Sequence, residues 1–159
     1  MSTDEGARDD LLLSEQACFA LYSASRAVTD VYRPLLAELG LTYPQYLVLL
    51  TLWEAEPRTV RDVGAALALD YGTVSPLLKR LEGTGFVERR REARDERTVT
   101  VHLTDAGRAL RDRVAHVPAT IGCALGLDDR ARRELIVLLR TLTASTIAFR
   151  GVDGESSAS

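Results

Sequence analysis

The hydrophobic pattern of this chain changes from a helical period to a strand period at one place. Residues 86–90 and 98–103 alternate apolar with polar side chains, and they bracket a charged segment from Arg91 to Arg97. Such alternation on both sides of a polar tip predicts a β-hairpin. In the rest of the chain, apolar residues recur near helical spacing. We therefore expect a mainly α-helical chain with one small β-hairpin.

Residues that cap helices divide the helical part into segments. The predicted helices cover residues 11–39, 42–54, 59–69, 70–82, 105–125 and 128–150. Pro34 is expected to kink or interrupt the first helix, and Gly40 to end it. A short helix, a tight turn, a second helix and a two-stranded hairpin form a winged helix-turn-helix. The pattern thus predicts this fold, with the hairpin as its wing.

The outer helices are longer than one small winged-helix core can cover. Their apolar stripes need a partner, which predicts a homodimer joined through the N- and C-terminal helices. The length of 159 residues suits a single domain. We expect one domain over residues 10–150, between a polar tail (1–9) and a disordered tail (151–159). Within this domain, dimerisation helices at about 10–40 and 105–150 flank a winged helix-turn-helix lobe at 42–104.

Charge is unevenly distributed along an acidic chain of net charge −3. Residues 79–97 hold seven basic and five acidic side chains, a local charge of +2. For nucleic-acid binding, the distribution of charge matters more than the net charge. No apolar run approaches the roughly 20 residues of a membrane helix, and the acidic first ten residues are the reverse of a secretory signal. We therefore expect a cytoplasmic protein with no membrane partner.

The second helix of the predicted helix-turn-helix has polar side chains in its first turn and cations further along. Polar groups can bond bases or phosphates, and cations suit the phosphate backbone. The candidates on this helix are Asp70, Tyr71, Thr73, Ser75, Lys79 and Arg80. An arginine at a wing tip can enter a minor groove, and the wing candidates are Arg89, Arg91, Asp95 and Arg97. A solvated turn whose charges pair with one another is the other interpretation of this segment.

Two segments resemble a known family. Asp95-Glu96-Arg97, with Leu103-Thr104-Asp105-Ala106-Gly107 after it, is similar to the wing and the following helix start of the MarR family. Residues 70–82 resemble the recognition helix of that family, and the resemblance extends over about 11–150. It implies a winged helix-turn-helix dimer that binds a pseudo-palindromic operator in double-stranded DNA. Members are usually repressors that a signal releases.

Two cysteines are too few for a disulfide scaffold, so each is a buried thiol or a redox group. Tyr22 lies one helical turn after Cys18, and Tyr32 and Tyr43 follow. A reactive thiol needs its thiolate stabilised by donors or positive charge, and phenolic hydroxyls can donate. The same tyrosines also suit a core in which their hydroxyls are satisfied. The residues by themselves leave both interpretations open.

Further similarity is to OhrR, the branch of the MarR family that senses organic hydroperoxides, and it covers residues 18–26, 32–36, 41–47 and 52–54. The resemblance implies that Cys18 is oxidised to sulfenic acid. It also implies that Tyr32 and Tyr43 hydrogen-bond the thiolate, with Tyr22 nearby. In two-cysteine members, a C-terminal cysteine resolves the sulfenic acid as an intersubunit disulfide. The resemblance implies this role for Cys123, for which a small buried residue in a helix interface is the alternative.

Other functions remain compatible with parts of the pattern. A MarR repressor can bind a phenolic or other small ligand in its dimer crevice, and Cys18→Ser would then respond normally to the signal. A thiol peroxidase would turn over hydroperoxide independently of the wing, whereas one oxidation per signalling event is expected here. His102 and His116 are too scattered from the cysteines for a closed zinc site. We expect no enzyme activity, no cofactor and no metal, with a cellular thiol reductant as a partner.

Overall fold

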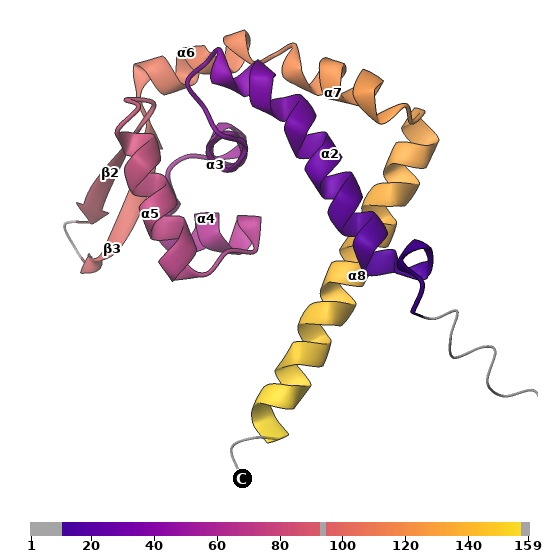
Figure 1. The fold of residues 1–159 in the computed structure, drawn as a ribbon. Helices are drawn as coiled ribbons and strands as arrows, with labels where there is room; N and C mark the ends of the chain where they lie inside the picture. The colour runs from indigo at the N-terminus through magenta and orange to yellow at the C-terminus, as the bar shows by residue number, and fades with distance from the viewer. Residues whose placement is uncertain (1–10, 93–94, 157–159) are drawn as a thin grey trace, which may run out of the picture. The chain divides into compact units, whose positions relative to one another are not determined.

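The computed structural model describes residues 11–92 and 95–156, with side chains described over 11–92 and 98–150. This part is mostly helical, with one three-stranded antiparallel sheet (Figure 1). The elements are η1 (Leu13–Glu15), α2 (Ala17–Ala37), α3 (Tyr43–Glu54), β1 (Arg58–Thr59), α4 (Val60–Leu67), α5 (Tyr71–Glu82), β2 (Val87–Glu92), β3 (Asp95–Leu103), α6 (Asp105–Arg113), α7 (Val117–Leu125) and α8 (Asp129–Ser156). The order confirms the predicted fold class, with α4 and α5 as the helix-turn-helix and β2 and β3 as the wing.

The described residues up to Ile121 form one compact unit, and those from Gly122 onward form a second. The hydrophobic core belongs to the first unit, where α3, α4 and α5 pack on one another and on the strands. In α5, the apolar side chains recur at helical spacing, so one face is buried and the opposite face is exposed. The buried residues of this helix are Val74, Leu77, Leu78 and Leu81, as the sequence pattern predicts.

Side-chain caps hold the helix starts that the sequence predicts. The backbone N–H of Thr42 donates to Gln45 Oε1 over 2.9 Å at the start of α3. At α4, Thr59 Oγ1 accepts from the backbone N–H of Asp62 over 3.0 Å. Such bonds satisfy N–H groups that have no partner within the helix. The caps of α5, α6 and α8 are Asp70, Thr104 and Asp128.

The sheet has the strand order β1-β3-β2, with both pairs antiparallel. The wing register runs from Val87 opposite Leu103 to Arg91 opposite Val99, with an irregularity between Arg91 and Glu92. The strand β1 was not predicted from the sequence. It has only two residues and pairs with β3 through Arg58 and Thr59, and a segment of that length has no period from which it can be recognised.

The helix predicted over 105–125 is two helices, α6 and α7. Val117 donates its backbone N–H to the carbonyl of Val114 over 2.9 Å. This bond spans three residues, as in a 3₁₀ turn, instead of the four residues that an α-helical bond spans. Pro118 has no N–H with which to continue the α-helical ladder to that carbonyl. The prediction of one continuous helix was therefore wrong, because the effect of this proline was not taken into account.

The two outer helices also differ from their predicted limits. The first begins at Ala17 after the short η1 turn, passes through Pro34 and ends at Ala37, and Gly40 follows with φ +70°. The last continues to Ser156, six residues past its expected end at residue 150. No proline occurs between residues 129 and 156, and glycine by itself weakens a helix without ending it. Residues 157–159 and the predicted tail 1–9 lie outside the described residues. Among the described helices, none has the length and apolar character of a membrane span.

Candidate nucleic-acid interface and thiol site

The first turn of α5 presents polar side chains to solvent. The Asp70 carboxylate accepts from the backbone N–H of Thr73 over 2.8 Å and from the Thr73 hydroxyl over 3.2 Å. Tyr71 beside it is 67% exposed. Asp70 therefore caps the helix and orients Thr73, while Tyr71 stands free to contact a groove.

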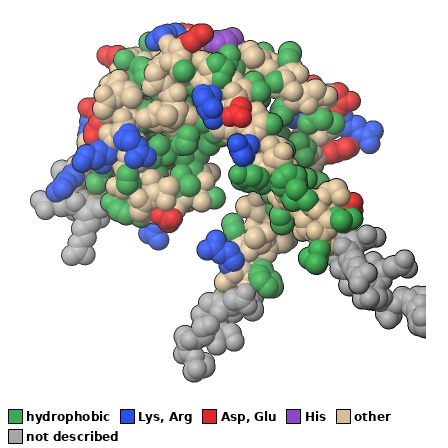
Figure 2. All heavy atoms as spheres, in the orientation of Figure 1, with side chains coloured by type: hydrophobic (Ala, Val, Ile, Leu, Met, Phe, Trp, Pro, Cys, Tyr) green, Lys and Arg blue, Asp and Glu red, His purple; other side chains and the backbone are tan. Residues whose placement is uncertain are grey.

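The remaining candidates on α5 divide by exposure. Lys79 and Arg80 are exposed in its last turn, where cations suit contact with phosphates. Ser75 is half-buried. Figure 2 shows Lys and Arg side chains gathered over the part of the surface that carries the wing. This arrangement fits the predicted nucleic-acid interface on the exposed face of α5 and the wing.

The charged residues of strand β2 are not equivalent. Arg89 pairs with Glu82 and Arg90 with Glu88, whereas Arg91 is exposed without a carboxylate partner among the described side chains. The interpretation of the wing charges as paired with one another thus holds for Arg90, whereas Arg89 pairs with a residue of α5. The side chains of Asp95 and Arg97 lie outside the described ones, so their predicted roles stay predictions.

Sequence reasoning missed two residues at this surface. Arg61, in the first turn of α4, lies with Tyr71 on the wall of a hollow of about 290 Å³. The sequence could have predicted a role for Arg61, because it lies two residues after the Thr59 cap. A helix N-terminus in a helix-turn-helix can face the phosphate backbone. Glu82 was missed because its pairing with Arg89 depends on how the wing folds back on α5.

Cys18 lies in the first turn of α2, and its side chain is exposed in the single chain. Tyr22, one turn later, is also exposed, and its hydroxyl accepts from Arg26 Nη1 over 3.4 Å. The Arg26 guanidinium lies 5.6 Å from the centre of the Tyr22 ring. Tyr22 is thus placed on the same stretch of helix as the thiol, next to a positive charge.

Three tyrosines form a cluster between α2 and α3. The rings of Tyr32 and Tyr43 are 4.4 Å apart between centroids, and those of Tyr32 and Tyr46 are 5.9 Å apart. Burial raises the pKa of Tyr32 to about 12, with smaller contributions from Tyr43 and Tyr46. Burial likewise raises the pKa of Tyr43 and Tyr46. The hydroxyls therefore stay protonated at neutral pH and are able to donate.

Cys18 and this tyrosine cluster are separated within one chain. Cys18 and Tyr32 are fourteen residues apart on the same helix, which corresponds to about 21 Å along its axis. The structure therefore brings Tyr32 and Tyr43 together but does not bring them to the Cys18 thiol of their own chain. Cys123 lies in α7, in the second unit, and its thiol is exposed as well.

The raised pKa of Tyr32 predicts how stability depends on pH. Between about pH 10 and 12 the folded chain keeps a proton that the unfolded chain has lost, so the free energy of unfolding should fall as pH rises through this window. Urea unfolding at pH 9, 10 and 11 should show this fall, and Tyr32→Phe should make it shallower. Tyr71→Phe, an exposed tyrosine outside the cluster, is the control. An equally steep fall in Tyr32→Phe would show that the cluster is not its source.

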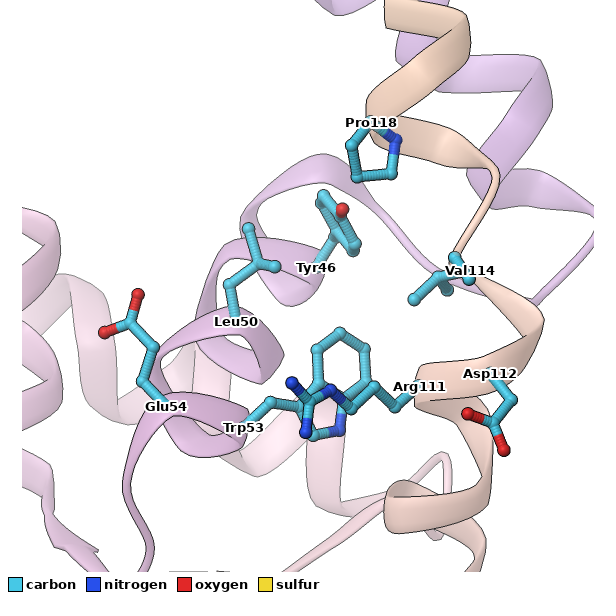
Figure 3. A pocket seen from close by; sticks show the side chains of 9 residues that line it. Tyr46, Leu50, Trp53, Glu54, Arg111, Asp112, Val114 and Pro118 are labelled. Atoms are coloured by element: carbon cyan, nitrogen blue, oxygen red, sulfur yellow. The ribbon is translucent and has the colours of Figure 1, made fainter.

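A pocket of about 340 Å³ lies between α3 and the segment that joins α6 to α7 (Figure 3). Tyr46, Trp53 and Arg111 line it, with Val114 and Pro118. The Trp53 indole Nε1 donates to the backbone carbonyl of Gly107 over 3.0 Å, which fixes the ring against α6. The pocket thus combines aromatic walls with one guanidinium and two carboxylates, those of Glu54 and Asp112, and it adjoins the tyrosine cluster through Tyr46.

Residues 30–114 match the family described as the transcriptional regulator SarA/Rot. The chain belongs to this MarR-like family of winged-helix transcriptional regulators. It is 49% identical over 131 residues to the HTH-type transcriptional regulator TtmR of Methylorubrum extorquens, covering 82% of this chain and 67% of TtmR. It is 46% identical over 127 residues to the organic hydroperoxide resistance transcriptional regulator of Bacillus subtilis, covering 80% and 84%.

Solved structures of a further regulator share the fold. The structure of reduced AbfR bound to DNA has a TM-score of 0.74 and 36% identity, covering 88% of this chain and 99% of AbfR. The disulfide-formed state of AbfR, a protein of Staphylococcus epidermidis, has a TM-score of 0.61 and 34% identity, covering 92% and 98%. Relatives of this chain therefore include transcriptional regulators, one of which is known in reduced, DNA-bound and disulfide forms.

Proposed function

We propose that this transcriptional regulator represses its target by binding a pseudo-palindromic operator as a homodimer, and that an organic hydroperoxide releases it by oxidising Cys18. The observation that carries the proposal is the contact between Tyr32 and Tyr43, two half-buried phenols whose protonated hydroxyls can donate. A thiolate bonded by two such hydroxyls is stabilised without a neighbouring cation. The similarity to the Bacillus subtilis organic hydroperoxide regulator supports the choice of oxidant.

For DNA, the exposed face of α5 would enter the major groove while the wing reaches the flanking backbone or minor groove. Tyr71, Thr73 and Ser75 would face bases or phosphates, and Lys79, Arg80 and Arg91 would contact phosphates, with Asp95 and Arg97 at the wing. The DNA-bound structure of AbfR supports this mode of binding.

The thiol site requires two chains in this proposal. Because about 21 Å of α2 separates Cys18 from Tyr32 in one chain, the donors to Cys18 would be Tyr32 and Tyr43 of the partner subunit. Apolar side chains left exposed on α2 and, separately, on α8 support a dimer. They are Phe19 and Leu21 on α2, and Leu135, Ile136, Val137, Leu138, Leu142, Ile147 and Phe149 on α8.

The chemistry proceeds in two balanced steps. The Cys18 thiolate attacks the terminal oxygen of the hydroperoxide, the O–O bond breaks, and the products are a sulfenic acid and an alkoxide that is protonated to an alcohol. The thiol of Cys123 of the partner subunit then attacks the sulfenic sulfur, forming a disulfide and releasing water. A cellular thiol reductant in the cytoplasm would return both thiols by disulfide exchange. Each cycle consumes one hydroperoxide per Cys18, and in this proposal the oxidation serves to release DNA and not to remove hydroperoxide.

The proposal is tested with fluorescence anisotropy on the intergenic DNA upstream of the protein's own gene. Reduced protein should bind, one equivalent of cumene hydroperoxide per chain should weaken binding by about 10- to 100-fold, and dithiothreitol should restore it. A non-reducing gel should show a covalent dimer in the oxidised sample that is absent in Cys123→Ser. Operator binding that is unchanged after peroxide would reject the redox switch, and an unchanged covalent dimer in Cys123→Ser would reject Cys123 as the resolving thiol.

The pocket at Trp53 favours one other function, release by a small phenolic ligand. Aromatic walls suit an aromatic ring, and a ring hydroxyl could donate to Glu54 or Asp112 or accept from Arg111. In that case salicylate, as the probe, would weaken operator binding by Cys18→Ser as strongly as by the wild type. No effect of salicylate on either protein would leave the hydroperoxide as the signal under test.

A further inference from the structure

The recognition helix and the wing are joined by one ion pair that a backbone hydrogen bond reinforces. Glu82 is the last residue of α5, and Arg89 lies in β2. The Glu82 carboxylate accepts from the backbone N–H of Arg89 over 2.8 Å and from its Nε over 3.0 Å, and Nη2 lies 2.9 Å from the same oxygen as Nε. Both carboxylate oxygens are therefore occupied by the same wing residue.

The pair spans a short connection whose own hydrogen bonds run back to the end of α5 and to Thr104, and none of those bonds involves β2. Residues 83–86 link α5 to β2 and include two glycines, one of which, Gly85, has φ +79°. The side chains of Glu82 and Arg89 are 34% and 27% exposed, so water screens them only partly. The pKa of Glu82 is lowered, first by the hydrogen bond from the Arg89 backbone N–H, so the carboxylate is charged at neutral pH.

The other ion pair of this strand does not join two elements. Arg90 pairs with Glu88 two residues away on the same strand, and their side chains are 60% and 42% exposed. An exposed pair within one strand contributes little to its position. Arg91 is exposed, and among the described side chains no carboxylate neutralises it. Three neighbouring arginines thus have three different surroundings.

We propose that Glu82 is a positioning residue for DNA binding, which holds the wing against the recognition helix through Arg89. Arg89 then connects two parts of the protein instead of contacting DNA, and Arg91 is the strand arginine that faces phosphates. A wing fixed before binding avoids the ordering cost that a mobile wing meets on the operator. The inference rests on the proposed DNA-binding function and adds a residue that contacts no DNA.

The direction in which one substitution changes operator affinity distinguishes this positioning role from simple charge repulsion between a carboxylate and DNA. A carboxylate near DNA repels phosphates, so its removal normally strengthens binding. Glu82→Gln should instead weaken operator binding by about tenfold, because the charge-assisted pair with Arg89 is lost. Glu88→Gln removes the same charge from the same surface and should bind as tightly as wild type or tighter. Fluorescence anisotropy on the operator measures both, and thermal unfolding midpoints within a few degrees of wild type show that both variants are folded.

A second variant addresses Arg89 itself and does not depend on the folding of Glu82→Gln. Lysine replaces arginine well as a point charge on phosphate but lacks the fork that fits a carboxylate. Arg89→Lys should therefore weaken binding as Glu82→Gln does. Arg90→Lys, at an exposed arginine that pairs only within its own strand, should retain wild-type affinity. Hydroxyl-radical footprints should lose protection only where the wing lies, with protection by α5 kept.

Each outcome has one meaning. Wild-type protein that does not bind its operator would contradict the proposed function. Wild-type binding together with unweakened binding by folded Glu82→Gln, or by Arg89→Lys, would overturn the positioning role and leave the proposed function standing.

Discussion

Gly107→Ala is expected to lower the thermal unfolding midpoint by about 10 °C, because among the glycines that the structure describes this one leaves the least room for a Cβ. A Cβ at this position would overlap the backbone carbonyl oxygen of Phe86 and lie 3.2 Å from Leu103 Cδ2. That carbonyl accepts from the Thr104 N–H over 3.0 Å, and Thr104 caps α6 through Gly107. Relief of the overlap must therefore separate α6 from the base of the wing, at a cost of about 3 kcal/mol or more.

Differential scanning calorimetry measures this effect, with Gly122→Ala as the matched control. Gly122 is also a helical glycine, but a Cβ there meets nothing within 4 Å. The control should keep its midpoint or gain up to about 1 kcal/mol from the better helix propensity of alanine. A midpoint of Gly107→Ala equal to that of wild type would show that α6 and the wing base move apart freely.

Cys18→Ser is expected to bind the operator as reduced wild type does and to ignore organic hydroperoxide. Serine is close in size and keeps a hydrogen-bonding group, but it has no sulfur that a hydroperoxide can oxidise. The wild-type affinity should fall by about 10- to 100-fold after one equivalent of cumene hydroperoxide, the usual range of coupling between two sites. Anisotropy titrations with and without oxidant give both values.

Cys123→Ser is the control for this second prediction. It keeps the proposed peroxidatic thiol, so it should still form a sulfenic acid, which dimedone traps and mass spectrometry detects at Cys18. Hydroperoxide release that persists in Cys18→Ser would remove Cys18 from the mechanism and direct attention to ligands of the pocket at Trp53.

The helix starts could be predicted from the sequence because capping is local. Thr42, Thr59 and Asp70 each act within three residues of themselves, so their spacing to the next polar residue carries the signal. The hairpin was predicted for the same reason, from alternation within two short runs. The two-residue strand β1 was missed because its partners on β3 are more than forty residues away in the sequence.

In the candidate sites, too, local features could be predicted from the sequence, whereas contacts between distant residues could not. The exposure of Tyr71 and the buried face of α5 follow from helical spacing, and so does the separation of Cys18 from Tyr32, since both lie on one predicted helix. The contact between Tyr32 and Tyr43 requires the angle at which α2 and α3 pack, which no local pattern contains. The pairing of Arg89 with Glu82 likewise depends on how four loop residues fold. This pairing places Arg89, one of the arginines predicted to contact DNA, in an ion pair within the protein.

The helix α8 has no buried side chain in the described part of the chain, although it carries a row of large apolar residues. If a second copy covers this row, folding and association become a single equilibrium, and the unfolding midpoint rises with protein concentration. While single chains predominate, the concentration of dimers rises as the square of the concentration of chains. Operator occupancy would then follow the copy number of the regulator steeply, and a falling copy number would empty the operator without any oxidant.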